Sequence, residues 1–310
     1  MVTVLLFPGQ GSQKVGMTRD LADRFDDARR ELDRIDAALD MSLTDLMWNG
    51  PEEALTLTQN AQPAILAHSA AVLAVLGDRV GTVVAAAGHS LGEYTAWVAS
   101  GAFEASDAAR LVRRRGELMF EAGQQRPGAM AAVLGLDSAA VQSACAQVQH
   151  DGDGVVVAAN LNAPDQTVIS GDPGAVMRGG ELCQAAGAKR VLPLKVSGAF
   201  HSPLMAPAVA PLRAAVSAMP IGSAAFPIVA NVTADVARSA DELVTLLVDQ
   251  LTAPVRWWES MRRLAELHPE ARWLEIGPGS VLSGLLKRIV PGVQCTPLGT
   301  AAQLDAFLAS

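Results

Sequence analysis

The sequence predicts an α/β protein in which helices cover a parallel sheet and a small second domain is inserted into the chain. Three observations support this fold class. Short apolar runs typical of strands alternate with longer helical segments. The stretch from 127 to 196 contains an element order of its own, β-α-β-β-α-β. Half of the 310 residues are apolar, so the chain can bury a large core.

The expected strands of the main sheet are short, and a glycine-containing turn follows each. They are Val2–Phe7, Thr82–Ala87 and Arg272–Ile276. Apolar residues at helical spacing lie between them and predict helices at Pro63–Leu76 and Ser106–Glu121, and another that begins near Glu93. These elements assign residues 1–126 and 197–310 to one main domain.

The inserted stretch is expected to fold separately. Ala129–Leu136 predicts a strand, and Ser138–Val148 predicts a helix with Asp137 as its N-cap. The remaining expected elements are strand Val155–Ala159, strand Thr167–Ser170, helix Gly174–Ala186 and strand Arg190–Leu194. This is the order of a split ferredoxin-like domain, which we expect to span residues 127–196.

Composition and charge exclude several classes of partner. The chain carries 24 basic and 32 acidic side chains, a net charge of −8, and only 4% of its residues are aromatic. Nucleic-acid binding favours a basic surface, and single-strand binding favours stacking aromatics, so no nucleic acid is expected. No uninterrupted apolar run reaches about 18 residues, and no basic region precedes the first one. We therefore expect neither a signal peptide nor a membrane span.

The three cysteines, Cys145, Cys183 and Cys295, lie far apart and form no CxxC pair. This spacing fits neither a disulfide framework nor a zinc site. We expect no bound metal, and we expect the reducing cytoplasm as the location.

The strongest chemical motif is Gly88-His89-Ser90-Leu91-Gly92, a G-x-S-x-G pentapeptide. In a nucleophile elbow the chain turns sharply from a strand into a helix, and glycine tolerates the crowded flanking positions. The expected strand before the motif and the expected helix after it provide this context. Ser90 is therefore the candidate nucleophile, and a glycine-rich turn with an incidental serine is the structural alternative.

A serine nucleophile needs a base, and the chain has five histidines. His201 follows the last strand of the small domain, on a loop that returns to the main domain and can face the elbow. The side chain of His89, inside the elbow, should diverge from the serine hydroxyl. The other three are less well placed: His68 on an apolar helix, His150 in a polar turn and His268 at a helix end. No Asp or Glu between Ser90 and His201 follows a main-sheet strand, so no carboxylate partner for the histidine is evident.

The loop Pro8-Gly9-Gln10-Gly11-Ser12-Gln13 follows the first strand. It is not a dinucleotide-binding fingerprint, because Lys14 stands at the third glycine position, and it is not a P-loop, because no GK[ST] follows. Beside the elbow, the backbone N–H of Gln10 could donate to an oxyanion. A tight structural turn is the equal alternative.

Several blocks along nearly the whole chain form a more specific pattern. They are Phe7–Gln13, Gln62–Ala64, Gly88–Tyr94, Arg115–Gly116, Asn160–Gly171, Gly198–Met205, Gln250–Trp257 and Glu275–Gly279. In this order they resemble the malonyl-CoA:acyl carrier protein transacylase family, which includes acyltransferase domains of polyketide synthases. The resemblance implies an α/β-hydrolase-like core with an inserted ferredoxin-like domain, in agreement with the element order above.

The resemblance also implies a ping-pong reaction with no permanently bound cofactor. Ser90 would accept the malonyl group from malonyl-CoA, and the phosphopantetheine thiol of acyl carrier protein would then collect it. His201 would act as the base, oriented by the backbone carbonyl of Gln250 in place of a carboxylate. The backbone N–H groups of Gln10 and Leu91 would form the oxyanion hole.

Further residues are assigned to substrate binding by the same resemblance. Arg115 matches the arginine that holds the malonyl carboxylate, which a planar guanidinium can bind bidentately. Its neighbours Arg113 and Arg114 leave open which of the three arginines points inward. Phe200 would exclude a methyl group at C2 of the acyl chain. Asn160, Asn162 and Gln166 match positions near coenzyme A or pantetheine.

Other functions remain open from the sequence alone. A trans-acting polyketide-synthase acyltransferase that uses another acyl-CoA would have nearly the same sequence. The sequence therefore does not decide whether the protein acts in fatty-acid or in polyketide synthesis. A serine acyl hydrolase or thioesterase would use the same elbow and histidine, and a non-catalytic scaffold would need neither. We expect a monomer that receives acyl carrier protein at a basic cluster, Lys189, Arg190 and Lys195; ordinary solvated strand-end charges are the alternative.

Overall fold

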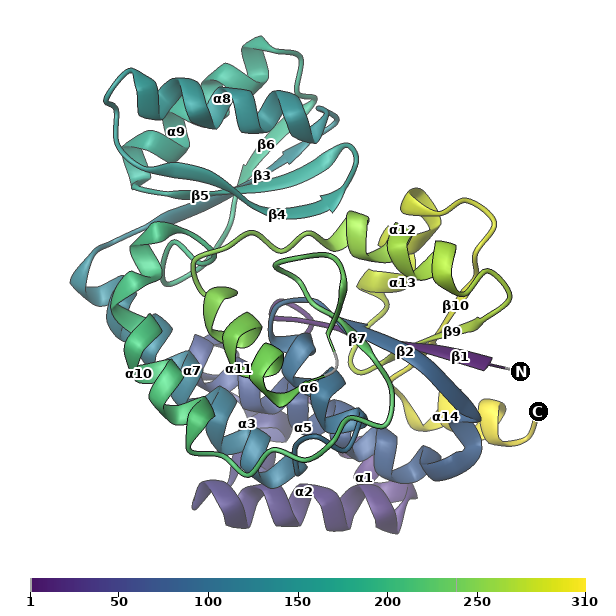
Figure 1. Ribbon diagram of the computed structural model, residues 1–310. Coiled ribbons are helices and arrows are strands. Elements are labelled where there is room, and N and C mark those ends of the chain that lie inside the picture. Colours follow the sequence, from purple (N-terminus) through teal and green to yellow (C-terminus); the bar gives the residue numbers. More distant parts are fainter. Residues whose placement is uncertain (1, 238) are drawn as a thin grey trace.

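The main sheet has six strands in the order β10-β9-β1-β2-β7-β8, in a computed structural model that describes residues 2–237 and 239–310 (Figure 1). All neighbouring strands run parallel except β7 and β8, which are antiparallel. The strands are β1 (Val2–Phe7), β2 (Thr82–Gly88), β7 (Ile228–Val229), β8 (Val236–Ala237), β9 (Arg272–Ile276) and β10 (Cys295–Leu298). The three main-sheet strands that the sequence predicts are all present.

Helices cover both faces of this sheet. Side chains of a strand alternate between the two faces, so each apolar strand contributes to a cluster on either side. Leu5 and Phe7 of β1 point into one apolar cluster, whereas Val4 and Leu6 point into another. The first face packs against α5 (Thr58–Leu76), α6 (Leu91–Ala99) and α7 (Ala105–Gln125), and the second against α12 (Trp257–Leu267) and α13 (Val281–Ile289). The other helices around the main sheet are α1 (Arg19–Arg24), α2 (Asp26–Leu39), α3 (Leu43–Asn49), α4 (Glu52–Thr56), α10 (Ala206–Ser217), α11 (Ala240–Asp249) and α14 (Ala301–Leu308), with short 3₁₀ turns η1 (Gly77–Val80) and η2 (Pro203–Met205).

The small sheet is antiparallel, with the order β4-β5-β3-β6. Its strands are β3 (Ala129–Leu134), β4 (Val156–Ala163), β5 (Gln166–Gly171) and β6 (Arg190–Pro193), and α8 (Ser138–His150) and α9 (Pro173–Ala185) cover one face (Figure 1). The predicted β-α-β-β-α-β order is therefore confirmed. Asp137 caps α8 as expected, since its carboxylate accepts from the N–H of Ala139 at 2.8 Å. The domain boundaries at 127 and 196 stay predictions.

Helix α5 begins five residues before the predicted start at Pro63 and carries this proline in its interior. With η1 it forms a stretch, Thr58–Val80, that is long and apolar enough to cross a membrane by length and composition alone. In the fold most of this stretch is buried, and α5 packs against α7 and α2. It is thus the central helix of the larger apolar cluster.

Candidate active site

The chain turns sharply between β2 and α6, and Ser90 lies in the turn. Its backbone is in a strained region, with φ 51° and ψ −104°. The flanking glycines permit the turn: a Cβ on Gly88 would lie 1.9 Å from the carbonyl oxygen of Gly92, and a Cβ on Gly92 would lie 2.1 Å from that of Phe7. This is the strand–turn–helix geometry of a nucleophile elbow.

His201 reaches Ser90 from the loop that follows β6. Its Nε2 lies 2.8 Å from Ser90 Oγ, and its Nδ1 lies 2.8 Å from the backbone carbonyl oxygen of Gln250. Since a carbonyl oxygen only accepts, Nδ1 carries the hydrogen, and Nε2 is left to accept the serine proton. Burial, followed by the nearby charge of Arg115, lowers the pKa of His201 to about 3, so the imidazole is neutral at physiological pH.

Arg115 projects from α7 into the same place. It is buried, and its Nη2 donates to Ser90 Oγ at 3.2 Å and to Gln250 Oε1 at 2.9 Å, while its Nη1 donates to Gln62 Oε1 at 2.7 Å. The centroid of the Tyr94 ring lies 5.2 Å from the guanidinium carbon of Arg115. Within residues 2–237 and 239–310, no carboxylate forms an ion pair with Arg115, so its charge is available to an anionic ligand.

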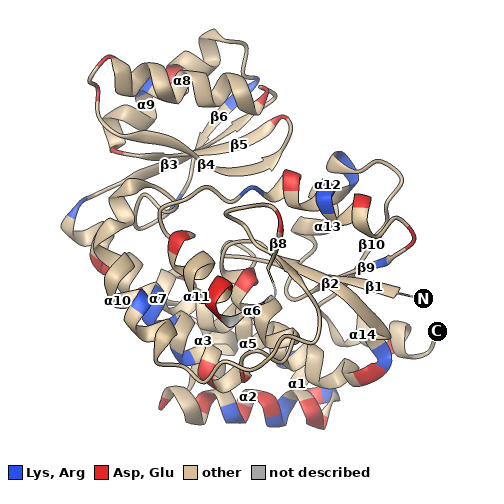
Figure 2. Cartoon of the chain, in the orientation of Figure 1, with Lys and Arg blue, Asp and Glu red and all other residues tan. Residues whose placement is uncertain are grey.

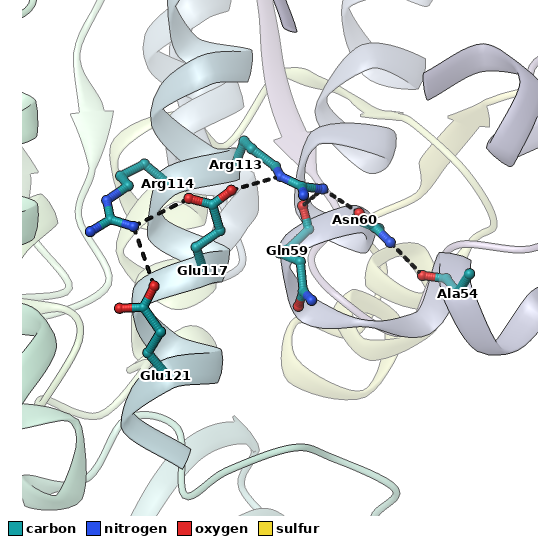
Figure 3. Close-up of polar contacts among 7 residues, drawn as sticks. All are labelled: Ala54, Gln59, Asn60, Arg113, Arg114, Glu117 and Glu121. Atoms are coloured by element: carbon teal, nitrogen blue, oxygen red, sulfur yellow. Dashed lines mark hydrogen bonds and ion pairs between the residues drawn. The ribbon is translucent and has the colours of Figure 1, made fainter. Parts of the chain in front are cut away.

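The two neighbouring arginines, Arg113 and Arg114, form other contacts, which Figure 3 shows. Arg114 is exposed and pairs with Glu117 and Glu121. Arg113 pairs with Glu117 and donates to the carbonyl oxygen of Gln59 at 3.1 Å. That carbonyl lacks its helical partner because Pro63, four residues on, has no N–H. Both arginines therefore form contacts at the surfaces of α5 and α7, and Arg115 alone of the three contacts Ser90.

A cavity of about 300 Å³ opens over these groups. Gln10, Leu91 and Phe200 line it together with Ser90 and His201. Among the residues that the structure describes, neither the backbone N–H of Gln10 nor that of Leu91 donates to a protein acceptor. Two unpaired N–H groups beside a serine hydroxyl can stabilise a negative oxygen.

The structure separates the three polar residues that the resemblance assigns to coenzyme A or pantetheine. Asn160 lines the cavity. Asn162 instead binds the Nε2 of His89, 2.8 Å from its Oδ1, and the His89 ring lies against Trp257, so His89 diverges from Ser90 as expected. Gln166 accepts from Arg288 at 2.7 Å and does not line the cavity.

Two buried side chains at the elbow escaped the sequence analysis as functional residues. Asn231 accepts from the N–H of Ser90 at 2.7 Å and donates to the carbonyl oxygen of Gly88 at 2.7 Å. Glu93, in the first turn of α6, accepts from the N–H of Asn231, and burial raises its pKa to about 7. A carboxylate in an apolar helix is a signal for Glu93, whereas no sequence pattern links Asn231 to the elbow.

The described part of the chain contains no group of three or more His, Cys, Asp or Glu side chains placed to hold a metal ion. The chemistry available at this site is that of a serine, a neutral histidine and an unpaired arginine.

Comparisons with known proteins give one consistent result. The family model for the acyl transferase domain matches residues 4–301. The malonyl CoA-acyl carrier protein transacylase of Bacillus subtilis is 45% identical over 92% of this chain and 89% of its own length, and that of Escherichia coli K12 is 41% identical over 98% and 97%. Among solved structures, a malonyl transacylase in complex with its type II polyketide synthase acyl carrier protein superposes with a TM-score of 0.95 at 41% identity, over 100% of this chain and 99% of that one.

Proposed function

The chain belongs to the acyl transferase family, among the malonyl-CoA:acyl carrier protein transacylases, and from this premise we propose that it moves a malonyl group from malonyl-CoA to acyl carrier protein through a malonyl-Ser90 intermediate. The observation that carries the proposal is the position of Arg115. Its buried cation touches the hydroxyl that His201 can deprotonate, and it has no carboxylate partner in the described structure.

The first half-reaction forms the acyl-enzyme. Ser90 Oγ attacks the thioester carbonyl carbon, and its proton passes to His201 Nε2. The carbonyl oxygen becomes negative and is stabilised by the N–H groups of Gln10 and Leu91. When the C–S bond breaks, the coenzyme A sulfur takes the proton from His201, which leaves a malonyl ester on Ser90 and a neutral imidazole.

The second half-reaction is the reverse with a different thiol. The phosphopantetheine thiol of the carrier protein gives its proton to His201 and attacks the ester carbonyl carbon. The C–O bond breaks, and Ser90 Oγ recovers the proton. Gln250 supports both halves because its backbone carbonyl keeps the Nδ1 hydrogen in place. A neutral carbonyl stabilises the imidazolium less than a carboxylate would, which suits a base that must release its proton readily.

Arg115 would hold the malonyl carboxylate during both halves. A carboxylate that enters a partly dry pocket loses hydration, and a fixed guanidinium replaces it. Phe200, 6% exposed at the cavity wall, would limit the space near C2 of the acyl group. A hydrolase for neutral acyl groups would gain nothing from a buried cation here, so transfer of a carboxylated acyl group is the better-supported function.

The proposal is tested by incubation with malonyl-CoA, followed by quenching and peptide mass mapping. We expect a malonyl adduct on the peptide that contains Ser90, and its release as malonyl carrier protein when holo acyl carrier protein is added. Ser90→Ala should abolish both. An adduct on another residue would contradict the mechanism, and release mainly as free malonate would favour the thioesterase.

A further inference from the structure

A buried polar network braces the elbow, and the reaction described above leaves it without a role. It consists of the side chains of Glu93, Asn231 and Gln250, each 0% exposed. Glu93 lies on α6, Asn231 follows β7, and Gln250 follows α11. Residues from three separate parts of the chain thus meet directly beneath Ser90.

One oxygen of Glu93 holds the other two residues. Its Oε2 accepts from the backbone N–H of Asn231 at 3.0 Å and from Nε2 of Gln250 at 2.8 Å. Its Oε1 is buried and has no partner among the residues described. Because both bonds end on one oxygen, the network needs an acceptor at this point, and a proton on Oε1 would leave both bonds in place.

This acceptor decides how the Gln250 amide is oriented. Its Nε2 donates to Glu93 at 2.8 Å, and more weakly to the carbonyl oxygen of Ser90 at 3.1 Å and to Asn231 Oδ1 at 3.3 Å, so its Oε1 is left to accept from Arg115. A flipped amide would turn its NH₂ group toward the guanidinium and its oxygen toward the carboxylate, and both contacts would be repulsive. Glu93 is the nearest of these three acceptors and the only carboxylate among them, so it contributes most to the face that Gln250 offers to Arg115.

We propose that Glu93 is a positioning residue for substrate binding: by fixing the Gln250 amide, its Oε2 holds the Arg115 guanidinium beside Ser90, where it receives the carboxylate of the acyl group. The inference rests on the proposed role of Arg115 as the carboxylate clamp. A purely structural role for Glu93 has a different consequence, since it would affect carboxylated and neutral acyl groups alike.

The experiment measures kcat/KM for malonyl-CoA and for acetyl-CoA and compares their ratio among variants. Glu93→Leu removes the acceptor, and we expect the ratio to fall about tenfold or more, mainly through a higher KM for malonyl-CoA. Glu93→Gln can keep an amide oxygen at the Oε2 position, so its ratio should stay within about threefold of the wild type. Gln250→Ala keeps the backbone carbonyl that orients His201 and should reproduce the fall seen in Glu93→Leu.

A second buried carboxylate provides a matched control. Glu275 accepts from the N–H groups of Leu282 and Ser283 at the start of α13 and does not line the cavity. Glu275→Gln should lower the melting temperature and leave the ratio unchanged.

Arg115→Ala in the same assay separates two kinds of failure. If it shifts the ratio but Glu93→Leu does not, the positioning role of Glu93 is wrong and the clamp stands. If Arg115→Ala leaves the ratio unchanged, the clamp itself is wrong, and the positioning role falls with it. Should Glu93→Leu fail to fold, Glu93→Ala, which also removes the acceptor, takes its place in the comparison.

Discussion

Arg115 is the side chain on which the proposed selectivity for a carboxylated acyl group depends. It is buried, and its acceptors in the described structure are neutral: Gln62, Gln250 and the Ser90 hydroxyl. In the proposed function, the carboxylate of the malonyl group would be the anion that compensates this charge. A neutral acyl group would leave the charge of Arg115 uncompensated and would gain no binding energy from it.

We predict that Arg115→Ala lowers kcat/KM for malonyl-CoA about 10²-fold relative to that for acetyl-CoA, or on the order of 3 kcal/mol. The measurement is the ratio of the two specificity constants in wild type and variant. Arg113→Ala, which removes the arginine two residues earlier from the contact with Gln59, should leave this ratio unchanged. An equal loss for both substrates in Arg115→Ala would make the residue structural.

His201 gives a prediction about pH. Because burial lowers its pKa to about 3, the free enzyme keeps a neutral base well below pH 6.5. We expect kcat/KM for malonyl-CoA to stay level between about pH 5 and 7, without the tenfold fall per pH unit that an ordinary histidine would cause below its pKa. A midpoint near 6.5 in this profile would show that the base is solvated in the free enzyme.

At the scale of single elements, strand β6 joins the small domain to the cavity. It is an edge strand of its sheet, and Leu194, just beyond its end, lines the cavity together with Lys195. Lys189 and Arg190 are exposed at its beginning. The basic cluster and the cavity are therefore adjacent, which suits a partner that must deliver a long prosthetic arm.

We predict that reversing Lys189 and Arg190 to Glu raises KM for acyl carrier protein and leaves KM for malonyl-CoA unchanged. Carrier proteins of this kind are typically acidic and the chain itself is net −8, so local attraction must offset overall repulsion. Reversal of Arg30 and Arg34 on α2 is the matched control, since this helix carries charges of both signs at the opposite end of the molecule (Figure 2). Equal effects on both substrates, or in both double variants, would reject docking at β6.

The sequence predicts elements and motifs better than it predicts contacts between distant residues. The elbow at Ser90 and the order of the small domain depend on local patterns of glycine and apolar residues, and these patterns are visible in sequence. The predicted start of α5 at Pro63 was wrong, because this proline lies inside the helix. Arg113 donates to the carbonyl oxygen of Gln59, which Pro63 leaves without a helical partner. Asn231 could not be predicted, because its bond to Ser90 joins residues 141 positions apart.

For the whole molecule, the buried histidines predict how stability depends on pH. Burial lowers the pKa of His68 to about 4 and that of His201 to about 3, and it lowers the pKa of His89 as well. Below pH 6.5 the unfolded chain binds protons at these positions that the folded chain does not, so stability is lost as the pH falls. Glu93 has the opposite effect between about pH 4.5 and 7, because its pKa is raised in the fold.

Three histidines outweigh one glutamate, so we predict that the free energy of unfolding rises between about pH 5 and 6.5, by about 1.4 kcal/mol per pH unit for each net proton. Urea unfolding at a series of pH values measures this slope. His68→Gln should reduce it by close to one proton. A slope of zero in the wild-type protein would mean that these rings take up protons without unfolding.

The place of β1 in the main sheet has a consequence for how the protein is made. β1 lies between β2 and β9, so its pairing is complete only after residues 272–276 have been synthesised. Ser90 is likewise synthesised before His201 and Gln250, the proposed base and the residue whose carbonyl orients it. In the proposed mechanism, Ser90 would therefore become reactive only after residues 201–250 have been synthesised and have folded against it.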